Sequence, residues 1–243
     1  VNGRINYQDW VLYECPGAGF LHGTVSSDEP NLCGFWNYEE DGVATISSTY
    51  TLTPADAFAM SMSMTNANDG GGIFLGYDAH LRAATNTPVF EFAGRAFATE
   101  SGTSTYIAGL TNTDPSGTAF EVLPTAGCYF TASSTQANWF AVCSTSAAAT
   151  TVFNTGVAST TARNLGHFHR FRIEMDNSGA NFYMQTAPTT TMQFLTRMTG
   201  ANYPSTASLT PGIYITDDGT AGVVSNFIVQ YARVWIKKTL WAN

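Results

Sequence analysis

Apolar and polar residues alternate with a period of two in many short stretches of this chain. In residues 57–64, one parity holds only large apolar residues, namely Phe58, Met60, Met62 and Met64. Ala and Ser fill the other parity. Successive side chains of a strand point to opposite faces, so this pattern predicts a strand with one face on a core. We find no apolar stripe of helical period that lasts three turns, and therefore expect a chain built from strands.

The same alternation predicts further strands along the chain. They are expected at residues 9–14, 43–52, 73–77, 89–93, 105–110, 168–175, 180–185, 212–216 and 227–236. Turn-forming residues separate them at 66–72, 114–117, 176–179 and 217–219. Short strands divided by turns favour an all-β antiparallel sandwich. Sandwiches of this length form one domain, which here would comprise residues 1–243.

One predicted strand indicates which of its faces should meet the core. Phe171, Ile173 and Met175 share one parity and are expected inside. The intervening charged residues, Arg172 and Glu174, fall on the opposite parity. We interpret them, with the adjoining Asp176, as a solvated face at a strand end.

Four cysteines stand at positions 15, 33, 128 and 143, without a Cys-x-x-Cys pair. This spacing argues against zinc ribbons and thioredoxin-like redox sites. Local separation favours pairing Cys15 with Cys33 and Cys128 with Cys143. The second pair flanks residues 133–137, which read as a hairpin loop, and antiparallel pairing across that loop sets the two cysteines opposite each other. The alternative is buried free thiols that pack as small hydrophobic groups.

Charged residues make up only 12% of the chain, about half of the roughly 25% usual in globular proteins. A surface rich in Ser, Thr, Asn and Gly is expected, which suits β structure in an extracellular setting. The net charge of −8 would repel a phosphate backbone, so we expect no nucleic-acid partner. No run approaches the ~20 apolar residues that a membrane-spanning helix needs, and no membrane partner is expected.

Sequence motifs for catalysis are scarce. His167 and His169 have the spacing of two zinc ligands on one strand face, but no third ligand is near in sequence. We interpret them as histidines at a strand entrance. The chain has no Gly-x-Ser-x-Gly nucleophile elbow. The glycine triplet at 70–72 lacks the Lys-Ser/Thr of a phosphate loop and is predicted to form a turn.

Two kinds of ligand site have candidate residues. We expect no cofactor, and calcium is the ion that would suit the chain best, because two loops offer oxygen ligands: Asn66, Asn68 and Asp69 in one, Asp217 and Asp218 in the other. Neither loop has the full EF-hand pattern, and the same residues also suit turns. Aromatic platforms for sugar rings are expected among Trp10, Trp36, Tyr38, Trp139 and Tyr203, with core packing as the alternative for each.

Between Gly127 and Lys238 a series of strand and turn cues follows a recognisable order. The cues are Tyr129–Phe130, Asn138–Val142, Thr155–Val157, His169–Glu174, Asn181–Met184, Leu209–Ile215 and Tyr231–Trp235. This order resembles the concanavalin A-like, laminin G-like jelly-roll domains of tailed-phage tail and capsid-associated proteins. The resemblance implies two packed antiparallel sheets, but it leaves the function open because such folds host many functions. Residues 1–126 match only in general character.

Relatives of this architecture include glycoside hydrolases with a catalytic Glu-x-Asp-x-x-Glu strand. Glu174-Met175-Asp176 matches the first two acids of that motif, but Gly179 stands where the third acid would be. We therefore expect no hydrolysis.

Taken together, these features predict a non-enzymatic virion component, such as a capsid decoration, head-fibre or tail-fibre protein, located on the particle surface or outside cells. Its expected partners are other virion proteins, further copies of itself and host-surface glycans. Two alternatives stay open. One is a polysaccharide-degrading enzyme on the same sandwich, in which Glu174 would face Glu91 or Glu121 across a cleft. The other is a cellular lectin or adhesin module.

Overall fold

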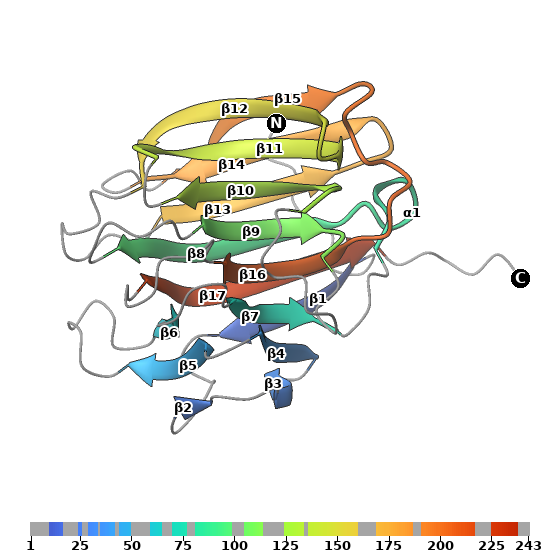
Figure 1. Ribbon diagram of the computed structural model, residues 1–243. Coiled ribbons are helices and arrows are strands. Elements are labelled where there is room, and N and C mark those ends of the chain that lie inside the picture. The colour runs from blue at the N-terminus through green and yellow to red at the C-terminus, as the bar shows by residue number, and fades with distance from the viewer. Residues whose placement is uncertain are drawn as a thin grey trace, which may run out of the picture.

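A computed structural model gives the architecture of the chain (Figure 1). The structure describes residues 10–16, 24–25, 29–33, 35–41, 44–49, 59–64, 70–76, 81–98, 105–113, 124–133, 136–159, 169–186, 191–216 and 225–237. For residues 16, 24–25, 29–33, 39–41, 44–49, 59–64, 96–98 and 225–226 it describes the backbone alone. Among the described residues, no helix is long and apolar enough to cross a membrane.

Two antiparallel sheets lie face to face in the described part of the chain (Figure 1). Sheet A has the strand order β15-β14-β13-β8-β17-β6-β5-β2, and β1 also pairs with β17. Its strands are β1 (Trp10–Pro16), β2 (Thr24–Val25), β5 (Ala44–Thr49), β6 (Ala59–Met64), β8 (Val89–Ala98), β13 (His169–Met175), β14 (Gly179–Gln185), β15 (Gln193–Thr199) and β17 (Ser225–Lys237).

Sheet B has the order β12-β11-β10-β9-β16-β7-β4-β3. Its strands are β3 (Glu29–Cys33), β4 (Trp36–Asp41), β7 (Gly70–Leu75), β9 (Thr105–Thr111), β10 (Gly127–Ser133), β11 (Asn138–Ser146), β12 (Ala149–Ala158) and β16 (Thr210–Thr216). A single helical turn, α1 (Ala83–Asn86), precedes β8. The predicted all-β antiparallel sandwich is therefore confirmed.

The interior between the sheets is aromatic. Phe92 of β8 stacks on Phe171 of β13 with ring centroids 4.5 Å apart, and Phe130 of β10 meets Phe171 edge-to-face from the other sheet at 5.0 Å. The predicted inward parity of β13 is confirmed, since Phe171 and Ile173 are fully buried and Met175 is 2% exposed. Arg172 and Glu174 therefore lie on the outer face of sheet A.

The predicted hairpin and its disulfide are also confirmed. β10 and β11 pair with Cys128 opposite Cys143, and the two residues are joined by a disulfide with a Cα–Cα distance of 4.2 Å. Cys15 is fully buried and disulfide-bonded as well. The side chain of its predicted partner, Cys33, lies outside the described part.

Some sequence-based expectations need correction. Residues 70–72 do not form a turn; they begin β7 and are buried. The reason is close packing: a Cβ on Gly72 would stand 2.3 Å from the Cβ of Tyr214 on the neighbouring strand, so only glycine fits. Four observed strands, β2, β3, β4 and β15, were not predicted. The predicted inward positions Phe58, Met60, Met62 and Met64 have side chains outside the described part.

Candidate functional site

The outer face of sheet A carries a continuous row of side chains across six strands, because strand register places six residues opposite one another. From β15 to β14, β13, β8, β17 and β1 these residues are Phe194, Tyr183, Arg172, Glu91, Arg233 and Glu14. We call this set the central row. It begins with two aromatic rings and continues with alternating charges. Neighbouring strands lie 4.7–4.9 Å apart, so six strands give the row a length of about 24 Å.

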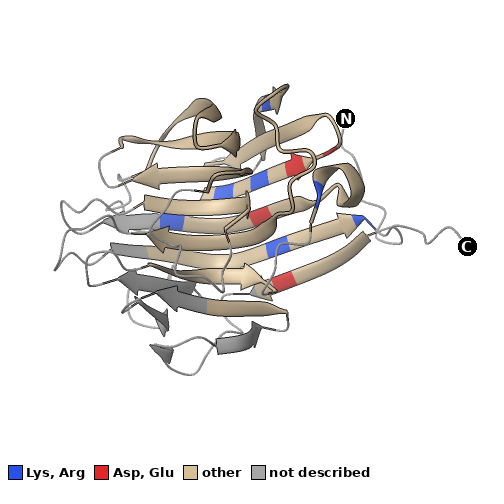
Figure 2. Cartoon of the chain, turned by 45° about the vertical axis from the view of Figure 1, so that its right-hand side comes forward, with Lys and Arg blue, Asp and Glu red and all other residues tan. Residues whose placement is uncertain are grey.

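Charged residues are rare in this chain, yet they gather here. Figure 2 shows the blue and red segments of the described chain concentrated on neighbouring strands of sheet A. Flanking rows contribute Arg170 and Gln185 on one side, and Glu174, Asn181 and Arg197 on the other. Because opposite charges stand next to each other, the face is held in a fixed pattern of donors and acceptors.

Glu91 is the anchor of this pattern. Its side chain is only 6% exposed, and one of its carboxylate oxygens lies 3.0 Å from Nη2 of Arg170. The same oxygen accepts a hydrogen bond from the Tyr231 hydroxyl at 2.8 Å. Arg170 also donates to the Tyr231 hydroxyl at 2.7 Å and to Gln185 at 3.1 Å. This closed network fixes β13, β8, β14 and β17 relative to one another on the outer face.

The network changes the titration of its members. Burial acts to lower the pKa of Arg170, but its contacts with Glu91 and Tyr231 outweigh burial and raise it. Burial, reinforced by the neighbouring Glu91 carboxylate, raises the pKa of Tyr231 to about 12. The guanidinium and the phenol therefore both keep their protons at neutral pH.

Two further ion pairs extend the pattern. Nη2 of Arg233 lies 2.7 Å from the Glu14 carboxylate, and its guanidinium stacks over the Tyr231 ring at 4.2 Å. Nε of Arg172 lies 3.1 Å from Glu174. The Glu174 carboxylate also accepts a hydrogen bond from the Tyr183 hydroxyl at 3.1 Å. These contacts connect the aromatic end of the face to its charged centre.

The turn between β13 and β14 holds a fourth pair. Asp176 accepts hydrogen bonds from the backbone of Ser178 and Gly179 and from the Ser178 hydroxyl, and it pairs with Arg197 at 2.9 Å. Burial acts to raise the pKa of Asp176, but the bonds from Ser178 and Arg197 outweigh it, and the pKa is lowered. The Asp176 carboxylate thus stabilises this turn, as expected for an Asp-Asn-Ser-Gly sequence.

The aromatic end of the face is the part most open to solvent. Phe194 is 57% exposed, on the edge strand β15. Its ring meets the ring of Tyr183 edge-to-face, with centroids 5.5 Å apart. Arg197 and Asn181, joined by a 2.9 Å hydrogen bond, lie in the next row on the same strands. An exposed ring beside amide and guanidinium groups can stack on an apolar ligand face while binding its polar rim.

Glu91 and Glu174, considered above as a catalytic pair, do share this face. The register sets Glu91 opposite Arg172 and Glu174 opposite Val89. The two acids are therefore diagonal neighbours, whose Cα atoms lie about 7–8 Å apart. Each is paired with an arginine, and Glu91 is almost fully buried. Both carboxylates are thus held in ion pairs and hydrogen bonds on this face. Glu121 lies outside the described residues.

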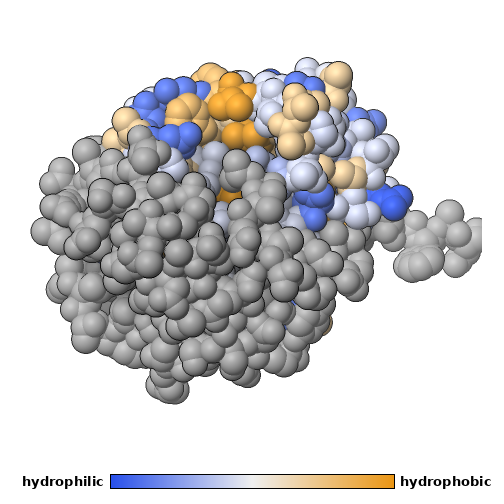
Figure 3. Space-filling model, in the orientation of Figure 1, coloured by the Kyte–Doolittle hydropathy of each residue, from blue (hydrophilic) through white to orange (hydrophobic). Residues whose placement is uncertain are grey.

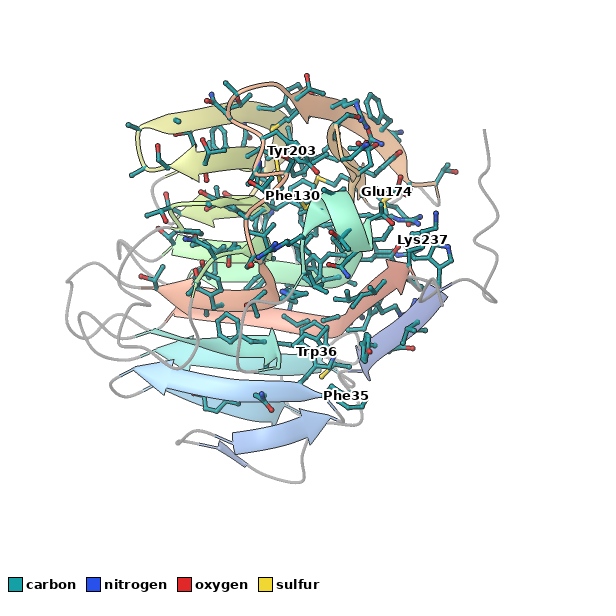
Figure 4. The ribbon with its side chains drawn as sticks, turned by 90° about the vertical axis from the view of Figure 1, so that its right-hand side faces the viewer. Phe35, Trp36, Phe130, Glu174, Tyr203 and Lys237 are labelled. Atoms are coloured by element: carbon teal, nitrogen blue, oxygen red, sulfur yellow. A yellow bond between two sulfur atoms is a disulfide. The ribbon has the colours of Figure 1, made fainter. Side chains whose placement is uncertain are left out.

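Four of the five candidate sugar platforms follow the alternative given for each of them, which is packing in the interior. Trp36, Tyr38 and Trp139 are at most 1% exposed and belong to the interior cluster. Tyr203 is 6% exposed and donates a hydrogen bond to the backbone carbonyl of Asp176. Figure 4 shows Trp36 and Tyr203 with Phe130 toward the interior, whereas Glu174 and Lys237 lie on the outer side.

Trp10 is the exception. It is half-buried and stands opposite Lys237, at the corner of the outer face of sheet A. Of the site's other members, Arg233 and Phe194 were missed, and Glu91 was considered only as a catalytic acid. The signal for them was present, since few charged residues occur in the chain and those in the strands at 170–174 and 231–235 share an outward parity.

Metal ligation is not supported by the described residues, where no group of three or more His, Cys, Asp or Glu side chains could hold an ion. The calcium candidates Asn66, Asn68, Asp69, Asp217 and Asp218 all lie outside that part. The same holds for His167, while His169 begins β13 and packs edge-on against Phe171. Calcium binding therefore stays a prediction.

The outer face of sheet B differs in character. Phe74, Ile107, Tyr129, Val142 and Tyr214 form a second apolar cluster there, at most 4% exposed. Three of its rings lie opposite glycines on the next strand: Phe74 on Gly212, Tyr214 on Gly72 and Tyr129 on Gly109. The space-filling view shows an apolar strip flanked by hydrophilic residues over β11 and β12 (Figure 3). Because the rings of this cluster are buried, none of them is available to stack on a ligand.

Comparison with known proteins finds relatives by structure alone. No family model matches the sequence. No curated protein matches it either. Among solved structures, a glycoside hydrolase family protein from Mycobacterium thermorestibile is similar with a TM-score of 0.55 and 12% identity, covering 92% of this chain and all of that chain.

Two lectin structures are equally similar. The lectin UEA-II, solved with galactose, has a TM-score of 0.56 and 9% identity, over 93% of this chain and 99% of its own. Arcelin-5, a lectin-like defence protein from Phaseolus vulgaris, has a TM-score of 0.53 and 9% identity, over 95% and 100%. At such low identity these likenesses show the fold alone: the chain is a jelly-roll sandwich of the legume-lectin-like, concanavalin A-like type.

Proposed function

We propose that this chain is a non-enzymatic, lectin-like module that binds glycans through the outer face of sheet A. The observation that carries the proposal is the central row, in which an aromatic pair, with Phe194 exposed and Tyr183 partly buried, continues into alternating arginine and glutamate side chains. Sugar rings have apolar faces and polar rims, and this row offers a stacking surface next to fixed donors and acceptors. The lectin-like fold supports the proposal.

The paired charges suit binding better than catalysis. Arg172 and Glu174 stand side by side with Tyr183, so a hydroxyl group placed over this pair could accept a hydrogen bond from the guanidinium and donate one to the carboxylate. Because Glu91 holds Arg170 and Tyr231 in place, little conformational freedom is lost when a ligand arrives. A face whose side chains are already ordered in this way is suited to binding a ligand without cleaving it.

The finer part of the proposal places the module on a virion, exposed to the outside, with other virion proteins and copies of itself as neighbours. The order of strand cues in residues 127–238 supports this role, as does the scarcity of charge. Many copies on one particle would compensate for weak single sites through high effective concentration. Labelled antibody against the chain should decorate intact particles, and failure to detect it in purified particles would refute the virion role while leaving glycan binding untouched.

The competing function is polysaccharide cleavage, favoured by the similarity to a protein of a glycoside hydrolase family. The two hypotheses separate in one experiment. The wild-type chain and the Phe194→Ala and Val152→Ala variants are incubated with polysaccharides immobilised on beads, and bound protein and soluble sugar products are both measured. Val152 is a matched control, since it is 58% exposed but lies on β12 in sheet B.

We expect wild type and Val152→Ala to be retained, Phe194→Ala to be released more readily, and no shortened sugar to appear. Retention that is equal in all three proteins would contradict the proposed face. Release of shortened products, abolished by Glu174→Gln, would establish the enzyme instead.

A further inference from the structure

We propose that the ligand of this face is an uncharged, linear oligosaccharide that lies across the strands along the central row, with its most tightly held unit at Tyr183 and Phe194. This inference rests on the proposed glycan-binding function and adds the class of glycan and its direction. It is drawn from the charge balance of the face, the length of the row and the uneven exposure of its two ends.

In the central row and its flanking rows the arginines and carboxylates are matched in pairs, whereas the exposed Lys237 stands outside these rows, at the corner beside Trp10. Four arginines each have a carboxylate partner: Arg170 with Glu91 at 3.0 Å, Arg172 with Glu174 at 3.1 Å, Arg197 with Asp176 at 2.9 Å, and Arg233 with Glu14 at 2.7 Å. An acidic sugar would have to compete with these carboxylates for every guanidinium. The chain as a whole carries a net charge of −8, which would repel a polyanion at long range.

Uncharged hydroxyl groups face no such penalty. Each arginine presents five N–H donors in a fixed fork, and a single carboxylate contact occupies only part of it. Carboxylate oxygens beside it accept hydrogen bonds from hydroxyl groups. A neutral sugar can therefore bind an ion pair without breaking it, whereas the charged group of a uronic acid or a sulfated sugar would be repelled by the carboxylate of the pair.

The shape of the face favours a chain over a single sugar. The central row extends about 24 Å across six strands. Its side chains are at least partly exposed on five of these strands, whereas Glu91 on β8 is nearly buried. Such a row offers several neighbouring subsites. Phe194 at one end is 57% exposed and supplies a stacking surface, while Glu14 at the other end is paired and one third exposed. The aromatic end should hold the first unit, and the charged end should be reached only by longer chains.

The test uses isothermal titration of the full chain with cello-, malto- and manno-oligosaccharides of increasing length, and with uronic-acid oligosaccharides of the same lengths. Each titration is repeated at low and high salt. Wild type is compared with Phe194→Ala, Glu14→Gln and the control Val152→Ala. Circular dichroism spectra of the four proteins establish that each is folded before binding is compared.

We expect at least one neutral series to bind, with affinity that rises with length up to the span of the row and changes little with salt. Phe194→Ala should weaken binding at every length by about two- to tenfold. Glu14→Gln should weaken only the longer chains, and Val152→Ala should match wild type.

Three results would overturn the inference in distinguishable ways. Tighter binding of the uronic-acid series, lost at high salt, would refute the neutral ligand but keep a glycan-binding module. Unchanged affinity in both Phe194→Ala and Glu14→Gln would place the site elsewhere on the molecule. Absence of binding to any oligosaccharide or immobilised polysaccharide would refute the proposed function itself.

Discussion

Glu91 is the most consequential single residue of the outer face, because it is nearly buried and neutralises Arg170 while accepting a hydrogen bond from Tyr231. Buried polar groups are costly when they lose a partner, more so than exposed ones. Arg170 is partly exposed, with 42% of its side chain accessible, so water would compensate for part of the loss.

The first prediction is that Glu91→Gln lowers the free energy of unfolding by about 1–3 kcal/mol, because the guanidinium of Arg170 loses its counter-charge. Glu174→Gln is the matched comparison, since Glu174 is also paired with an arginine but is 31% exposed. It should cost about 0–1 kcal/mol. Urea denaturation of both variants measures the difference, and equal costs would show that Glu91 is not an anchor.

Buried tyrosines should make the stability of the folded protein fall at alkaline pH. Burial raises the pKa of both Tyr231 and Tyr129 to about 12, from 10.0 for an ordinary tyrosine. A folded-state pKa above the unfolded one means that the unfolded chain releases its protons first as the pH rises. Stability contributed by the neutral phenols is therefore complete below pH 10 and is lost between pH 10 and pH 12.

The second prediction follows: the free energy of unfolding should fall across this alkaline window, and Tyr231→Phe should make the fall shallower. Denaturation midpoints at a series of pH values measure it. A wild-type stability that stays level up to pH 12 would contradict the burial of these phenols.

At the scale of elements, glycines decide how the strands of sheet B approach one another. Gly212 of β16 lies opposite Phe74 of β7, and a Cβ on Gly212 would stand 2.5 Å from Cδ1 of that ring. The ring in turn stacks against Tyr214 at 5.4 Å. The third prediction is that Gly212→Ala destabilises the protein by about 1–3 kcal/mol through overpacking.

The cost of Gly212→Ala should shrink in a Phe74→Leu background, because the clash is with that side chain. A double-mutant cycle of unfolding free energies measures this coupling. Gly109→Ala is the contrasting case, since its Cβ would meet the backbone of Tyr129 at 2.5 Å and no side-chain change can relieve it. Simple additivity at Gly212 would show that Phe74 does not lie on this glycine.

The disulfide between β10 and β11 supports the fourth prediction. It closes a loop with a sequence separation of 15, for which chain entropy gives about 3 kcal/mol of stabilisation. The Cys128→Ala, Cys143→Ala double variant should lose about that amount in thermal or urea unfolding. An unchanged stability would mean that the unfolded chain is already compact around this hairpin.

How far the sequence predicted these elements depended on how clearly each pattern showed which face was buried. Phe171, Ile173 and Met175 alternate with polar residues at a period of two, and this pattern identified β13 and its inner face correctly. The hairpin at Cys128 and Cys143 was predicted from the strand-like segments on either side of the loop at 133–137. β15 escaped because only one of its residues, Met198, is buried, so that apolar alternation is weak. The second half of β7 was predicted as part of a strand at 73–77, but its glycines at 70–72 were predicted to form a turn, because their burial comes from neighbouring rings rather than from their own side chains.

The candidate site was harder to predict than the fold. The outward residues of β13 were recognised, but their neighbours on β8, β17 and β1 are more than 60 positions away in the chain and meet only through register, as Arg170 does with Tyr231 at a separation of 61. Aromatic residues were predicted as platforms by type, although burial rather than type decides whether a ring can meet a sugar. Four of the five proved to be interior.

At the scale of the molecule, the two outer faces of the sandwich have different properties. The outer face of sheet B carries buried rings laid on glycines, whereas the outer face of sheet A carries a charge-balanced row with one exposed aromatic end. A fold shared by lectins and by a protein of a glycoside hydrolase family supplies the scaffold, and the row would supply the binding. The central claim is therefore that glycans bind to the outer face of sheet A and are not cleaved there.

The most direct test is a map of backbone amide chemical shifts on addition of a neutral oligosaccharide that binds in titration. We predict that the perturbed amides cluster on β15, β14 and β13 and extend along the central row toward β1, while the sugar remains intact in the same sample. Perturbations confined to sheet B, or the appearance of shortened sugar, would contradict the account.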